Sequence, residues 1–360
     1  MNTDLEFMAR ALQLAERGKF TTDPNPRVGC VLVKNGRIIG EGFHERAGQA
    51  HAEINALKNA SEDTNGATAY VTLEPCSHHG KTPPCCDALI AAGIKRLVVA
   101  MKDPNPLVAG LGLARCKAAG IEIICDVLRA DAEKLNRGFI SRMTKNRPFI
   151  RSKIAMSLDG KTALSNGESK WITSPQARAD VHLFRAKSSA ILTGIGTILA
   201  DNPSLNARVD FEIVQPIRVI LDSTLQMPFD AQITKSEGRT LILTCSTNEK
   251  KQTILKQAGF EIHVLPNAMG RLNLHVVMNF LADQEINNVF VEAGATLNGA
   301  LLEANLVDEW LIYMASCVLG DKGRGAFSLP ELHTMADKKN LQWQDIRHIG
   351  RDLRMTLQPF

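Results

Sequence analysis

The stretch EPCSHHGKTPPCC, residues 74–86, contains three cysteines and two histidines. Its Gly-Lys-Thr sequence would belong to a Walker phosphate loop only if a glycine stood five residues before Gly80, and that position is Pro75. The N-terminal residues lack the basic segment and apolar block of an export signal, so we expect the cysteines to be thiols or metal ligands and not disulfides. These residue types therefore favour a metal site.

A histidine and a glutamate upstream complete the predicted metal site. His51 and Glu53 form a His-Ala-Glu sequence at the start of a predicted helix, residues 51–60. Cys76 follows a predicted strand, and Cys85 opens the next helix, where the helix dipole favours a thiolate. Three protein ligands leave the fourth position of tetrahedral zinc open, as in catalytic sites. We predict that His51, Cys76 and Cys85 bind one Zn²⁺ and that Glu53 is the acid–base catalyst, a pattern typical of zinc deaminases.

Neighbouring residues compete for roles at this site. Cys86 is turned about 100° away from Cys85 around a helix, so we expect Cys85 to be the third ligand and Cys86 to be a small core or flanking residue. His78 and His79 lie in the loop between the two ligand cysteines. An exposed loop position and a contact with the substrate are equally compatible with these histidines.

The elements that must position these residues alternate between strands and helices. The N-terminus predicts an amphipathic helix, and residues 28–43 predict two strands joined by a hairpin turn at Asn35-Gly36. Helices are then expected at 51–60, 85–92 and 110–119, and strands at 68–73, 96–101 and 121–125. This alternation predicts an α/β fold with a largely parallel sheet and helices on its faces.

A domain boundary is predicted near residues 141–148, where polar and basic residues precede a proline and a new apolar strand. We assign residues 1–145 to a first domain and residues 146–360 to a second. The second domain is again expected to be α/β, with strands near 189–193, 217–221, 240–244, 261–265 and 289–292.

Two glycine clusters in the second half are candidate dinucleotide-binding sites. Gly194 and Gly196 begin a G-x-G sequence, but Leu199 stands where the fingerprint requires a third glycine. Gly294 lies between a predicted strand and a helix expected from about Thr296. The free N–H groups at such a helix start suit a phosphate, although an ordinary strand-to-helix turn produces the same pattern.

The motifs NPRVGCVLV, GFHERAGQAHAE and EPCSHHGKTPPC resemble the deaminase domain of the bifunctional deaminase/reductases of riboflavin biosynthesis. This resemblance implies a cytidine-deaminase-like three-layer α/β/α fold. It also implies hydrolytic deamination of 2,5-diamino-6-(5-phosphoribosylamino)pyrimidin-4(3H)-one. Asn25 would then hydrogen-bond the substrate, and His44 would touch its ring or its phosphate. A turn role for Asn25 and a structural role for His44 remain as alternatives.

The motifs KIAMSLDGK, GESKWIT, ILTGIGTILADNPSLNAR and VEAGATLNGALL resemble the reductase domain of the same family. The resemblance implies a dihydrofolate-reductase-like α/β fold and reduction of the ribosyl group to ribityl by NADPH. The implied NADPH contacts are Ala155, Trp171, Thr197, Asp201, Gly294, Ala295, Thr296, Leu297, Asn298, Gly299 and Ala300. The implied substrate contacts are Lys153, Ser169, Arg185, Leu205, Arg208 and Glu292.

Several of these residues also have simpler interpretations. Arg185 and Arg208 are the predicted phosphate ligands because the planar guanidinium donates two parallel hydrogen bonds. The alternative for Arg185 is a solvated position on a helix. The alternative for Asp201 is a turn role, and the alternative for Trp171 is a core position. The sequence assigns no acid–base residue in this half, since hydride transfer mainly requires positioning of the two reactants.

Composition restricts the class of ligand. The net charge is only +4, aromatic residues make up 5%, and no run of Lys and Arg stands out, which disfavours nucleic acid as the main ligand. No stretch reaches the roughly 20 apolar residues needed to span a bilayer. We therefore expect a cytoplasmic enzyme that acts on a small molecule, binds neither nucleic acid nor membrane, and forms a homo-oligomer through an exposed sheet edge. A tRNA or nucleoside deaminase with an accessory domain, and a redox or structural zinc protein, are the alternatives.

Overall fold

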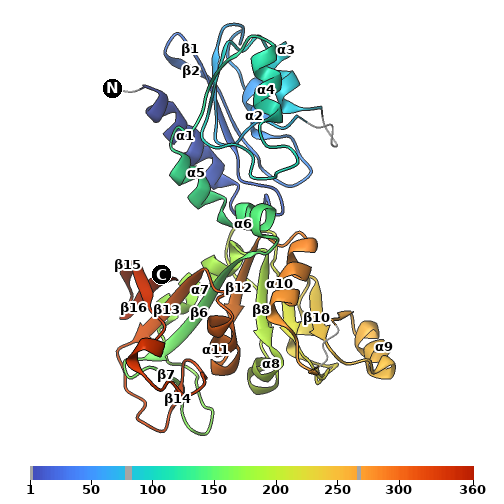
Figure 1. Ribbon diagram of the computed structural model, residues 1–360, viewed down its shortest axis with the longest axis vertical. Coiled ribbons are helices and arrows are strands. Elements are labelled where there is room, and N and C mark those ends of the chain that lie inside the picture. Colours follow the sequence, from blue (N-terminus) through green and yellow to red (C-terminus); the bar gives the residue numbers. More distant parts are fainter. Residues whose placement is uncertain (1–2, 78–82, 266–268) are drawn as a thin grey trace. The chain divides into compact units, whose positions relative to one another are not determined.

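The computed structural model describes residues 3–77, 83–265 and 269–360 (Figure 1). The chain divides into two compact units. The first comprises Met1–Asn146 together with Glu212–Val214, and the second comprises Arg147–Phe211 together with Gln215–Phe360. No helix in the described part of the chain combines the length and the apolar composition needed to cross a membrane.

The first unit contains a five-stranded sheet in the order β2-β1-β3-β4-β5. Its strands are β1 (Gly29–Lys34), β2 (Arg37–Phe43), β3 (Thr68–Val71), β4 (Arg96–Val99) and β5 (Glu122–Ile124). The predicted hairpin places β1 antiparallel to β2, and β1 is also antiparallel to β3, so the sheet is mixed. The hairpin turn reverses the chain between β1 and β2, and the following helix carries it over β1 to β3. The last three strands are parallel.

Helices cover both faces of this sheet, so the predicted three-layer arrangement is confirmed. The helices are α1 (Thr3–Arg17), α2 (Ala52–Lys58), α3 (Cys85–Ala91), α4 (Leu111–Ala118), α5 (Arg129–Leu135) and α6 (Arg137–Lys145). Alternate residues of β1 point to opposite faces. Cys30 and Leu32 pack with α2, α3 and α4, whereas Val31 and Val33 pack with α1 and α5.

The second unit contains a nine-stranded sheet in the order β11-β10-β9-β8-β12-β6-β13-β16-β15. The strands from β11 to β13 are parallel, and β16 and β15 are antiparallel additions at one edge. The bounds are β6 (Phe149–Ser157), β8 (Ala190–Gly194), β9 (Ile217–Leu221), β10 (Thr240–Thr244), β11 (Glu261–Val264), β12 (Asn288–Glu292), β13 (Glu309–Ala315), β15 (Leu341–Ile349) and β16 (Asp352–Pro359). A small separate sheet pairs β7 (Lys161–Ala163) with β14 (Arg324–Gly325).

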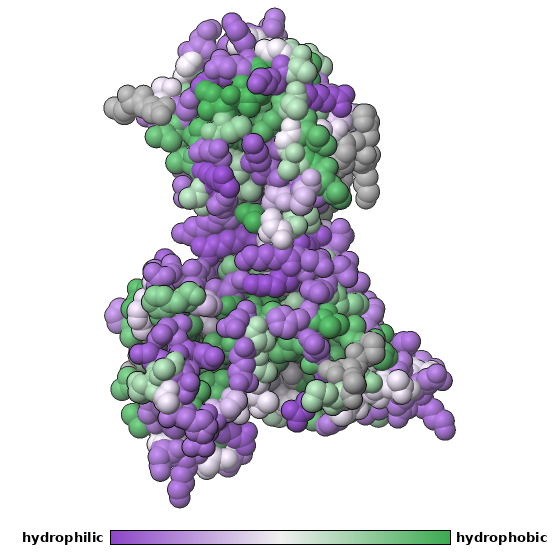
Figure 2. All heavy atoms as spheres, viewed as in Figure 1, coloured by the Kyte–Doolittle hydropathy of each residue, from purple (hydrophilic) through white to green (hydrophobic). Residues whose placement is uncertain are grey.

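Helices cover both faces of the nine-stranded sheet as well. Their bounds are α7 (Pro175–Ala186), α8 (Ile195–Asp201), α9 (Glu249–Gln257), α10 (Leu274–Asp283) and α11 (Ala295–Glu303), with 3-10 turns at Gln232–Lys235 and Met335–Asp337. One face of the sheet packs against α10 and α11, and the other against α7, α8 and α9. The surface over α9 is mostly hydrophilic (Figure 2), in keeping with a helix whose one buried residue is Leu255.

Candidate metal centre and reductase site

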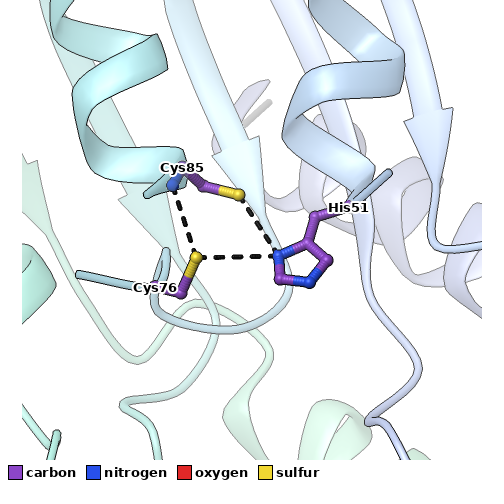
Figure 3. A group of neighbouring side chains, drawn as sticks. All are labelled: His51, Cys76 and Cys85. Carbon is purple, nitrogen blue, oxygen red and sulfur yellow. Dashed lines mark hydrogen bonds between the residues drawn. The ribbon is translucent and has the colours of Figure 1, made fainter. Parts of the chain in front are cut away.

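Three predicted metal ligands from separate segments converge in the first unit (Figure 3). His51 immediately precedes α2, Cys76 lies in the loop after β3, and Cys85 is the first residue of α3. Nδ1 of His51 lies 3.6 Å from Sγ of Cys76 and 3.3 Å from Sγ of Cys85, and the Cys85 N–H donates to Sγ of Cys76 at 3.3 Å. All three donor atoms lie within 4.8 Å of one another.

This donor set fits zinc. Zinc bonds of about 2.3 Å to sulfur and about 2.0 Å to nitrogen, at tetrahedral angles, place sulfur and nitrogen about 3.5 Å apart. The two distances from His51 Nδ1 to the cysteine sulfurs bracket that value. Hydrogen bonds from Cys85 and His51 lower the pKa of Cys76 to about 4, so its sulfur is held as the thiolate that binds metal.

Glu53, the predicted acid–base catalyst, lies in the first turn of α2 and is 3% exposed. Burial raises the pKa of its carboxyl group to about 7. A carboxyl group with a pKa near neutrality can both hold and release a proton under ordinary conditions. This carboxyl group lies two residues from His51, a predicted metal ligand.

His44 lies beside His51, a predicted metal ligand, and also contacts Asn25. His44 Nδ1 is 3.1 Å from the Ala50 carbonyl oxygen, and a carbonyl only accepts hydrogen bonds, so Nδ1 carries the proton. Nε2 of His44 then accepts from the Asn25 amide at 3.1 Å. The His44 ring packs edge-on against that of His51, with centroids 5.3 Å apart, and burial lowers the pKa of His44. His44 is therefore a neutral residue that orients Asn25.

Of the remaining candidates in the first unit, Cys86, His78 and His79, only Cys86 lies within the described residues. Cys86 is fully buried in the core between the sheet and the helices α2, α3 and α4, in agreement with the core role expected for it. His78 and His79 lie outside the described residues.

A buried cluster of charged residues brings together three predicted substrate contacts of the second unit. Glu292 ends β12 and stands opposite Lys153 of β6 in the strand register, with Nζ of Lys153 3.8 Å from its carboxylate. Arg185 of α7 donates to the same carboxylate through Nε at 2.5 Å and Nη2 at 3.0 Å, and through Nη1 to the Asn206 carbonyl at 2.9 Å. Burial alone would raise the pKa of Glu292. The positive charges of Arg185 and Lys153 have the larger effect and lower the pKa to about 2.

The interpretation of Arg185 as a solvated helix residue is wrong, because its side chain is 14% exposed. Each of its three guanidinium nitrogens donates a hydrogen bond, two of them to Glu292 and one to Asn206. Arg208 is exposed instead, and its Nη1 donates to Oδ1 of Asn206 at 3.2 Å. Arg208 is therefore the more accessible of the two predicted phosphate ligands.

His182 contacts Arg208 through both ring nitrogens, and it was not among the residues predicted from the sequence. The backbone N–H of Arg208 donates to Nδ1 of His182 at 3.1 Å, and Nη2 of Arg208 lies 3.0 Å from Nε2. A neutral imidazole has one acceptor nitrogen, so it accepts one of these donors at a time. Burial, with the nearby charges of Arg185 and Arg208, lowers the pKa of His182 to about 4. The available signal was its place three residues before Arg185 on the same helical face.

The predicted cofactor contacts follow the carboxyl ends of adjacent parallel strands, where ligands of open α/β sheets bind. Ala155 lies near the end of β6, Thr197 and Asp201 lie on α8 after β8, and Gly294 precedes α11 after β12. Within α11, Asn298 is buried and accepts from the Ser152 hydroxyl at 2.9 Å, and a Cβ on Gly299 would lie 2.0 Å from the Ser328 carbonyl oxygen. The first turn of α11 is thus available to a ligand, whereas Asn298 and Gly299 face the interior.

The remaining predicted contacts lie in irregular segments. Ser169 lies between β7 and α7, and Leu205 is buried with a φ of 46°. The alternative that Trp171 is a core residue is wrong, because it is 68% exposed with the Arg178 guanidinium 4.4 Å from its ring centroid.

Comparisons with known proteins cover both halves of the chain. The family model described as the cytidine and deoxycytidylate deaminase zinc-binding region matches residues 1–101, and the one described as the RibD C-terminal domain matches residues 148–355. The riboflavin biosynthesis protein RibD of Escherichia coli K12 is 49% identical over 98% of this chain and 99% of its own. That of Haemophilus influenzae is 47% identical over 99% of this chain and 97% of its own.

Solved structures agree over the same length. RibD of Acinetobacter baumannii superposes with a TM-score of 0.93 at 41% identity, covering 99% of each chain. A Thermotoga maritima protein, titled a diaminohydroxyphosphoribosylaminopyrimidine deaminase/5-amino-6-(5-phosphoribosylamino)uracil reductase, superposes with a TM-score of 0.88 at 36% identity, again over 99% of each chain. With a zinc-type ligand set in one unit, a reductase domain in the other, and relatives matched from end to end, the chain belongs to the RibD family, the bifunctional deaminase/reductases of riboflavin biosynthesis.

Proposed function

We propose that the deaminase half acts on 2,5-diamino-6-(5-phosphoribosylamino)pyrimidin-4(3H)-one and that the reductase half converts the ribosyl group of the product to ribityl with NADPH. The observation that carries the proposal is the convergence of His51, Cys76 and Cys85 beside the buried Glu53. The printed title of the Thermotoga maritima relative supports this substrate pair. We assign the two activities to residues 1–145 and 146–360.

In the deaminase half, His51, Cys76 and Cys85 would hold one zinc ion per chain. Zinc, when bound, lowers the pKa of a water molecule and so makes it a nucleophile near neutral pH. The water oxygen forms a bond to the ring carbon that carries the amine, and the bond from that carbon to the exocyclic nitrogen breaks. Glu53 takes one proton from the water and delivers it to the ring nitrogen. It then carries the second proton, from the new hydroxyl group, to the amine, which leaves as ammonia.

Asn25 and His44 are proposed to orient the pyrimidine substrate. The Asn25 amide group is fixed because its Nδ2 donates to Nε2 of His44. His44 is fixed in turn by the Ala50 carbonyl. A side chain whose rotamer is locked by such partners binds a ligand at a lower entropic cost than a free one.

In the reductase half, NADPH when bound would supply a hydride for C1′ of the ribosyl group. The bond from C1′ to the ring oxygen breaks, and that oxygen takes up a proton, which yields the open ribityl chain. Lys153 and Glu292 would hold the sugar, and Arg208 would bind the phosphate with Arg185 orienting Glu292 beside it. Gly294 and the N–H groups of the first turn of α11 would face the cofactor phosphates. Ala155 near the end of β6, and Thr197 and Asp201 on α8, would contact the same cofactor.

The test is a reaction of the zinc-loaded protein with the diaminopyrimidine substrate, followed by mass spectrometry with and without NADPH. We expect a deaminated product alone, converted to a reduced product when NADPH is added. Replacement of NADPH by NADH should slow the second step. No product in either condition, from folded protein with one zinc per chain, would contradict the substrate assignment.

We propose that the chain acts on small molecules and does not bind nucleic acid. A tRNA deaminase with the same metal ligands would bind RNA with a strong salt dependence. Filter binding of tRNA at two salt concentrations should therefore show no salt-dependent retention. Tight retention that is lost at high salt would favour the tRNA deaminase instead.

We also propose that the protein is a homo-oligomer that pairs through β15. This strand is the outer strand of the nine-stranded sheet, and its Trp343 and Ile346 are 57% and 56% exposed. Their cross-strand partners Leu357 and Met355 belong to the buried core, so all four side chains share one face of the sheet. The edge of β15 together with this apolar extension of the core fits a second copy of the same strand.

A further inference from the structure

Glu74 is a buried carboxylate, 5% exposed, in the loop between β3 and the metal ligand Cys76. Its two oxygens accept four backbone hydrogen bonds. Oε2 accepts from Asp103 at 3.1 Å and from Gly110 at 2.9 Å. Oε1 accepts from Gly112 at 2.9 Å and from Leu113 at 3.2 Å. With both oxygens engaged in this way, the charge is compensated without any contact to the metal site.

The four N–H groups belong to one continuous part of the chain. Asp103 and Gly110 lie in the loop that connects β4 to α4, and Gly110 is its last residue. Gly112 and Leu113 are the second and third residues of α4, whose N-cap residue, Gly110, has no side chain to accept from them. From the loop after β3, Glu74 therefore accepts the hydrogen bonds that an N-cap side chain ordinarily accepts, and it places a negative charge at the start of the helix.

The backbone that follows Glu74 rests on the same turn of α4. A Cβ at Gly112 would lie 2.0 Å from the Pro75 carbonyl oxygen, so only glycine permits this approach. On its other side, Cys76 is held by α3, because its carbonyl accepts from the Cys86 N–H at 3.2 Å and its sulfur accepts from the Cys85 N–H at 3.3 Å. The metal ligand Cys76 is thus fixed between two helix starts.

We infer that Glu74 is a positioning residue that sets the place of Cys76 at the metal centre and ties it to the 103–110 loop. It acts through Pro75 and the backbone and touches neither metal nor substrate. The inference rests on the zinc-binding part of the proposed function and is independent of the identity of the pyrimidine.

The matched variants are Glu74→Gln and Asp4→Asn. The first keeps the volume of the side chain but turns an amide group toward two N–H donors. The second weakens a partly buried carboxylate that pairs with Arg96 and Tyr70 in the same unit, with no contact to Cys76. The readouts are the zinc dissociation constant, measured by competition with a chromophoric chelator, and the absorption spectrum of the Co²⁺-substituted protein.

Glu74→Gln should weaken zinc binding by about 10- to 100-fold and change the Co²⁺ spectrum, whereas Asp4→Asn should leave both at wild-type values. Where Glu74→Gln yields no folded protein, Glu74→Asp replaces it, since its shorter carboxylate reaches fewer of the four N–H groups. Folded Glu74 variants with wild-type zinc affinity and spectrum would overturn the inference and leave the proposed function intact. A wild type that binds zinc but does not convert the pyrimidine would contradict only the proposed function.

Discussion

At the scale of single residues, Glu53 combines the two properties that a proton carrier needs, a place beside the metal ligands and a pKa of about 7 produced mainly by burial. Glu53→Gln keeps the volume of the side chain but replaces the carboxyl group, which carries the proton, with an amide. We expect the deamination rate to fall by about 10²- to 10⁴-fold, with the zinc content unchanged. The reductase rate on substrate that is already deaminated serves as the internal control. Loss of zinc together with activity would make Glu53 a ligand or a folding residue.

His182 offers a second prediction at this scale. His182→Leu removes the acceptor for the Arg208 backbone, so the reductase KM for the phosphorylated substrate should rise about tenfold. The kcat should change little, because the phosphate lies away from the reacting carbon. Leu183→Ala, at the neighbouring and partly exposed position of α7, is the control. An equal loss of activity on a substrate without phosphate would rule out a role through Arg208.

Residues whose roles depend on local spacing can be predicted from the sequence. Residues whose roles depend on partners far away along the chain cannot. His51 immediately precedes a helix, Cys85 begins one, and Cys76 lies in the loop after a strand. These positions can be read from hydrophobic patterns. Glu74 and His182 have no such signal, because their partners lie 29 to 39 and 26 residues downstream. The engagement of Arg185 with Glu292 is likewise visible only in three dimensions.

At the scale of elements, apolar strands followed by helices were predicted well because each buried strand has a continuous apolar run. The strands β13, β15 and β16 were not predicted. For β15 the physical reason is that the strand is exposed along much of its length and that its apolar alternation is interrupted by the bulge between Trp343 and Asp345. The helices α5 and α6 were not predicted either, because the sequence indicates only a domain boundary, near residues 141–148, in this part of the chain.

Zinc would join the starts of α2 and α3 to the loop after β3, and this gives a prediction about elements. A strong chelator should lower the Tm of the first unit by at least about 5 °C, because a ligand that binds only the folded state adds to its stability. Differential scanning calorimetry measures the transitions of the two units. The transition of the second unit should not move on chelation but should rise when NADPH is added. Equal shifts of both transitions on chelation would contradict a zinc site confined to the first unit.

At the scale of the whole molecule, the homo-oligomer that we propose forms by pairing of β15 with its copy in a second chain. Trp343→Lys places a charge on the apolar extension of the core and should convert the oligomer to monomers. Met335→Lys, at a residue that is 79% exposed and lies outside the sheet, should leave the mass unchanged. Size-exclusion chromatography with light scattering measures the mass. A monomeric wild type, or an unchanged mass for Trp343→Lys, would contradict pairing through this strand.

The place of β6 has a consequence for biosynthesis on the ribosome. This strand lies near the middle of its sheet, yet its two neighbours are β12, where Phe149 pairs with Asn288, and β13, where Arg151 pairs with Glu309. A growing chain therefore carries an apolar strand whose partners have not yet been translated. Such a topology delays folding and exposes strand edges to aggregation. The C-terminal half should depend on chaperones during synthesis more than the N-terminal half, in which all five strands are complete by Ile124.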